Sequence, residues 1–96
     1  SRTAKWDYLL VSFFTENWEK VSLVANSLLD YYDGKSGFNV CQLSVAIAYA
    51  QSRLGDTTSC CGYFEICKSH SDDVILKKLR QRQWWDIYEQ IEDICE

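Results

Sequence analysis

The chain has 96 residues, 47% of them apolar, and 14 acidic against 10 basic side chains give it a net charge of −4. A chain of this length buries one core, so the sequence predicts a single domain over residues 1–96. The acidic balance argues against a nucleic-acid partner, and no apolar run approaches the ~20 residues that a membrane-spanning helix needs.

Two helical patterns occupy the first third of the chain. Residues 4–14 place apolar side chains at helical spacing, and residues 16–32 show the clearest amphipathic pattern. Thr15 offers a hydroxyl cap in front of the second pattern. Turn-forming residues at 33–37, two of them glycines, end it. The sequence therefore predicts helices over 4–14 and 16–32.

A third helix is predicted over residues 40–54. Asn39 and Gln42 have the spacing of a capping box, and Gly55 ends the pattern. Several alanines keep the helix slim, which lets neighbouring helices approach closely. We therefore expect it to be the most buried helix of the domain.

A cysteine-rich stretch, TSCCGYFEICKSH, follows at residues 58–70. The sequence predicts a connector here, either irregular or with one short strand near residues 57–68. A further helix begins after Ser71, whose hydroxyl can cap it. Its apolar stripe slips at 81–83, so it either rotates its contacts or kinks there. The predicted fold is all-α, a small bundle of four to five helices.

The five cysteines allow three interpretations. Zinc needs four ligands in short-spaced pairs, and Cys61, Cys67 and His70 are irregularly spaced. Two disulfides with one cysteine left over would suit a secreted domain. The sequence favours reduced thiols in a cytoplasmic protein, with no metal and no cofactor, because the apolar content is sufficient without bridges. On this view Cys41, Cys67 and Cys95 are buried, whereas Cys60 and Cys61 are exposed and reactive.

Other chemical motifs are weak. Gly34-Lys35-Ser36 resembles the end of a phosphate-binding loop but lacks its earlier glycine and preceding strand. Cys67 and His70 could share a helical turn, but nothing predicts a substrate pocket beside them. A helix-turn-helix would need a shorter turn and more base-reading side chains on its second helix. We expect no enzymatic activity.

The C-terminal segment carries the most unusual charge pattern. A cluster of basic residues at 77–82 is followed by Trp84-Trp85 and then by acids up to residue 96. Acids near a helix C-terminus oppose the helix dipole, so local helix stability does not explain them. Neighbouring side chains on a helix point about 100° apart, so at least one of the two tryptophans should be partly exposed.

These features predict a small acidic interaction module, most concretely an inhibitor or immunity-type protein that blocks a basic toxin or nuclease. Opposite charge on the two partners would speed their encounter. The predicted partner-binding residues are Trp84, Trp85, Asp86, Glu89, Glu92 and Asp93, with Asp30 and Asp33 as further candidates. The alternative is a homodimeric assembly or regulatory subunit whose seam is formed by Trp84, Ile87, Ile91 and Ile94. A DNA-binding regulator and a thiol or zinc sensor are further alternatives.

Overall fold

The computed structural model describes residues 1–82 and 84–96 and consists there of six helices without strands. The helices are α1 (Arg2–Phe14), α2 (Trp18–Tyr32), α3 (Gly37–Arg53), α4 (Thr57–His70), α5 (Asp73–Arg80) and α6 (Trp84–Cys95). The predicted all-α class is confirmed, with six helices in place of four or five. Within the described residues, no helix is both long and apolar enough to cross a bilayer.

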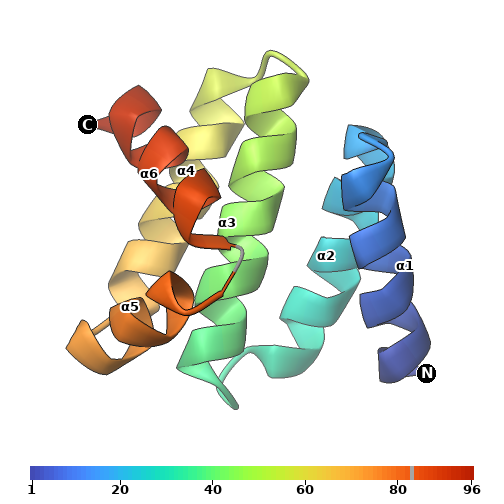
Figure 1. The fold of residues 1–96 in the computed structure, drawn as a ribbon, viewed down its shortest axis with the longest axis horizontal. Helices are drawn as coiled ribbons and strands as arrows, with labels where there is room; N and C mark the ends of the chain where they lie inside the picture. Colours follow the sequence, from blue (N-terminus) through green and yellow to red (C-terminus); the bar gives the residue numbers. More distant parts are fainter. Residues whose placement is uncertain (83) are drawn as a thin grey trace.

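Helix α3 lies at the centre of the molecule. Helices α1 and α2 lie on one side of it and α4, α5 and α6 on the other (Figure 1). Residues 40–48 are all buried, as expected of a helix whose small side chains let neighbours approach from several directions. Its N-terminus is capped by Ser36, whose hydroxyl accepts a hydrogen bond from the Asn39 amide at 3.2 Å. The sequence was right about the burial of this helix but placed its start three residues late.

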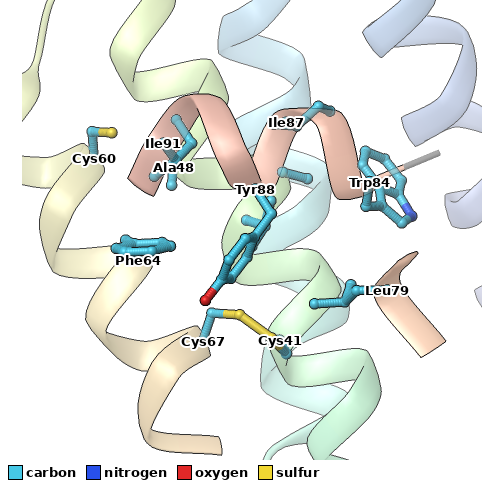
Figure 2. Close-up of a cluster of buried hydrophobic side chains, with 12 residues drawn as sticks. Cys41, Ala48, Cys60, Phe64, Cys67, Leu79, Trp84, Ile87, Tyr88 and Ile91 are labelled. Carbon is cyan, nitrogen blue, oxygen red and sulfur yellow. A yellow bond between two sulfur atoms is a disulfide. The ribbon is translucent and has the colours of Figure 1, made fainter. Parts of the chain in front are cut away.

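Two apolar clusters divide the core, and α3 contributes to both. One joins α1 and α2 to α3 and includes Leu9, Val21, Leu28, Leu43 and Ile47. The other joins α3 to α4, α5 and α6, and its buried members are Cys41, Val45, Ala46, Ala48, Cys60, Phe64, Cys67, Leu79, Trp84, Ile87, Tyr88 and Ile91 (Figure 2). Helix α6, which carries the candidate functional site, packs into the second cluster.

The cysteine-rich stretch is helix α4, so the predicted connector or strand near residues 57–68 is wrong. Asp56 caps the helix, and its carboxylate accepts a hydrogen bond from the Ser59 amide at 3.0 Å. Gly62 weakens a helix by about 1 kcal/mol relative to alanine, which is why the local sequence is a poor helix signal. Burial of Phe64 and Cys67 against α3 and α6 supplies the stabilisation that local preference lacks.

Two short helices take the place of the single C-terminal helix whose stripe slips at 81–83. Helix α5 ends at Arg80 and α6 begins at Trp84, so the kink was the correct alternative. Gln83, part of the predicted slip, lies outside the described residues. The cap of α5 is Asp72 and not Ser71, with the Asp72 carboxylate accepting from the Ile75 amide at 2.8 Å.

Candidate functional site

Helix α6 separates apolar and acidic side chains onto two faces. Trp84, Ile87 and Ile91 are buried against α3 and α4, at the spacing of three and four that marks one helix face. Asp86, Glu89 and Asp93 repeat the same spacing on the exposed side. We call the set Asp86, Glu89, Glu92 and Asp93 the acidic face; Glu92 is partly buried and the other three are exposed.

No residue of the acidic face forms a salt bridge within the described part of the chain. The next acid along the chain, Glu96, behaves differently. Its carboxylate accepts a hydrogen bond from Lys68, which also lies 3.5 Å from Glu65. That hydrogen bond from Lys68 to Glu96 raises the pKa of the lysine above its usual value. Among the residues that the structure describes, Glu96 is thus paired with Lys68, and the four acids before it have no cationic partner.

The two adjacent tryptophans have different environments. Trp84 is only 4% exposed and meets Phe13 edge-on, with ring centroids 5.3 Å apart. Trp84 is one of the predicted partner-binding residues, and its ring lies almost entirely within the core of the chain. Trp85 is partly exposed and stacks on Tyr88 at 5.0 Å, while the Arg80 guanidinium lies 4.8 Å from its ring centroid. The expectation that at least one of the pair is partly exposed is confirmed.

A notch lies beside the acidic face, between α1 and α6. Its volume is about 250 Å³, and it is lined by Leu10, Phe13, Phe14, Trp84, Asp86 and Ile87. Phe14, at its rim, is 75% exposed, which is unusual for an aromatic ring. An exposed ring next to a hollow is a typical anchor point of a protein interface. The sequence did not indicate the notch, because its two walls are about seventy residues apart in the chain.

Asp30 and Asp33, the further candidates, lie elsewhere. Both are exposed at the end of α2, beside a hollow of about 190 Å³ that they share with Ile66 and His70. That hollow has no lining residue from α6. The structure therefore does not combine these two acids with the acidic face into one surface.

The cysteines differ from the expectation of five reduced thiols. Cys41 is bonded to Cys67 and Cys61 to Cys95, and Cys60 is free. Cys60 is also fully buried, so its predicted exposure is wrong, whereas the burial of Cys41 and Cys67 is confirmed. The apolar periodicity indicates which cysteines lie on a helix face that can be buried. It contains no information about which sulfur atoms form bonds. The bonds join α3 to α4 and α4 to α6.

The sulfur atoms of Cys60, Cys61 and Cys95 lie within 4.8 Å of one another. The neighbouring residues Cys60 and Cys61 thus both bring their sulfur atoms close to that of Cys95. Thiolates, not disulfides, bind metals. With the Cys61–Cys95 bond formed, Cys60 alone could supply a thiolate, and its pKa is raised by burial and by the nearby Asp56 carboxylate.

The structure buries most of the surface that the homodimer and helix-turn-helix interpretations need. The seam proposed for a homodimer has Trp84, Ile87 and Ile91 in the chain's own core, and only Ile94 is well exposed. The second helix of the helix-turn-helix interpretation would be α3, which is the most enclosed helix in the molecule. A recognition helix has to enter a groove of DNA, which a central helix cannot do.

No protein family, characterised protein or solved structure is detectably similar to this chain.

Proposed function

We propose that this protein is an interaction module that binds a basic protein partner through the acidic face of α6 and the adjacent notch. The observation that carries the proposal is the set of four carboxylates on one helix that have no cationic partner in the described part of the chain. Two of them, Glu92 and Asp93, lie in the last turn of α6, where the helix dipole is unfavourable for acids. Their position contributes nothing to the stability of the helix, so an external role accounts for them better.

The notch supports the same proposal because it places an apolar hollow next to the charged acidic face. Protein interfaces combine a buried apolar centre with a polar rim. Asp86 belongs to both surfaces, since it lines the notch and begins the acidic face. A partner with an apolar side chain next to two or three lysines or arginines would fill the notch and neutralise the carboxylates together.

The more specific form of the proposal is a non-enzymatic inhibitor or immunity-type protein. Its support is the small size, the net charge of −4 and the exposed Phe14 beside the acids. A basic toxin or nuclease uses a cationic surface to hold its own anionic substrate. The acidic face would occupy that surface and exclude the substrate.

The two disulfides indicate the type of cellular compartment in which the protein would bind such a partner. Disulfides persist in secreted proteins and in oxidising compartments, and they are rare in the cytosol. We therefore propose an oxidising compartment for the folded protein, in place of the cytoplasmic location expected from the sequence.

Charge reversal tests the proposal. Native mass spectrometry of the gently purified protein is expected to give a one-to-one complex with a basic protein. With that partner immobilised, Glu89→Lys/Asp93→Lys should slow association roughly tenfold or more at low salt, because steering by opposite charge is lost. Stopped-flow or surface plasmon resonance at several salt concentrations measures the rate.

The matched control is Asp7→Lys/Glu19→Lys, which makes the same change in net charge on exposed positions of α1 and α2. It should slow association much less than the α6 variant. Equal effects of the two variants would mean that only net charge matters, and no effect of either would remove the acidic face as the docking site. If the partner is an enzyme, its activity should be blocked by the wild type and released by the α6 variant.

A further inference from the structure

The free thiol of Cys60 lies against a disulfide. Its Sγ atom is 4.0 Å from the Sγ atom of Cys95, which is bonded to Cys61, the next residue of α4. Cys60 is thus an alternative partner for Cys95 from the same turn of the same helix. Sulfur atoms at this separation are close to van der Waals contact, and they must approach each other by about 2 Å to form a bond.

We propose that Cys60 exchanges with the Cys61–Cys95 disulfide, and that the exchange creates a reactive thiol at Cys61. This thiol would be a modification site for disulfides and soft electrophiles. The proposal is independent of the acidic face of α6.

The step is an isomerisation and needs no oxidant or reductant. The Cys60 thiol loses its proton, and the thiolate attacks Sγ of Cys95. The Cys60–Cys95 bond forms as the Cys61–Cys95 bond breaks, and the Cys61 thiolate that leaves takes up a proton. An external disulfide could then react with this thiolate, giving a mixed disulfide on Cys61 and releasing one thiolate of the reagent.

Access to solvent makes the two thiols chemically different. Cys60 is fully buried, whereas Cys61 is partly exposed and is followed by Gly62, whose side-chain position faces open space. A reagent in solution can therefore approach residue 61 where it cannot approach residue 60. Burial also raises the pKa of the Cys60 thiol, which keeps it protonated and makes the exchange slow relative to that of an exposed thiol.

Helix α6 remains attached in both forms. Cys95 is its last residue and stays bonded to α4 whether its partner is Cys61 or Cys60. The exchange thus relocates the free thiol without releasing the end of α6 from the core. This is the structural reason why the alternative bond is compatible with the same fold.

The experiment uses the folded, oxidised protein with N-ethylmaleimide as the probe, followed by non-reducing digestion and fragmentation mass spectrometry. We expect one adduct per chain, located on Cys61, together with a Cys60–Cys95 bond. Glutathione disulfide in place of the maleimide should give a mixed disulfide on Cys61. Cys60→Ala, which lacks the attacking thiol but retains Cys61–Cys95, should lose labelling by both reagents.

Three results would overturn the proposal. An adduct on Cys60 with Cys61–Cys95 intact would mean that local opening, not exchange, exposes the thiol. Absence of any adduct in the wild type would mean that Cys60 is inert. The third result concerns Cys61→Ser, which is expected to fold with a Cys60–Cys95 bond and no free thiol. Two free thiols in that oxidised variant would show that the alternative bond does not form.

Discussion

Phe64→Ala is expected to lower the free energy of unfolding by about 3–5 kcal/mol, the usual cost of deleting a buried phenylalanine ring. Phe64 is the largest fully buried side chain of the protein. It extends from α4 into the cluster that α3 and α6 also line, with its ring centroid 5.2 Å from that of Tyr88 (Figure 2). Removing the ring leaves a cavity at the junction of three helices.

Chemical denaturation followed by circular dichroism measures this loss, and Phe14→Ala is the matched control. Phe14 carries the same ring but is 75% exposed, so its removal should change stability by no more than about 0.5 kcal/mol. Similar losses for the two variants would contradict the placement of α4 against α6.

Cys41→Ala/Cys67→Ala is expected to cost about 3.5 kcal/mol of unfolding free energy. The estimate comes from the chain entropy that a bridge over a sequence separation of 26 removes from the unfolded state. For a domain of this size the melting temperature should fall by about 15–25 °C. Differential scanning calorimetry under non-reducing conditions measures the shift.

The control for the double variant is Cys60→Ala. Cys60 is as deeply buried as Cys41 and Cys67 but forms no bond, so its replacement removes sulfur from the core without removing a cross-link. We expect a loss of about 1 kcal/mol. A double variant no less stable than this control would mean that the Cys41–Cys67 bridge does not contribute to stability.

The disulfides and the acidic face are connected through α6. The Cys61–Cys95 bond fixes the last residue of α6 to α4, and Lys68 of α4 holds Glu96 directly after it. Held at its end and buried along one face, α6 presents Asp86, Glu89 and Asp93 in a fixed geometry. Fixed charges lose less entropy on binding than mobile ones, which favours recognition of a partner with matching charges.

Several features of the fold could be predicted from local patterns. Residues 16–32 and 40–54 repeat apolar side chains every three or four positions, and only a helix places such residues on one side. The alanines of the second pattern correctly indicated that α3 is the most buried helix. The acids after Trp84-Trp85 were predicted to bind a partner, and Asp86, Glu89 and Asp93 are indeed exposed.

Local sequence patterns thus account for the helical class, the burial of α3 and the acidic character of α6, because each depends on residues within a few positions of one another. Other features depend on residues that are far apart in the chain and meet only in the folded protein. Helix α4 continues past Gly62 because Phe64 and Cys67 are buried against α3 and α6. Trp84 is buried and Trp85 is not because Phe13, seventy-one positions before Trp84, lies edge-on to its ring. The packing of α3, α4 and α6 determines which sulfurs bond and which thiol lies beside Cys95. No periodicity within one helix encodes that packing.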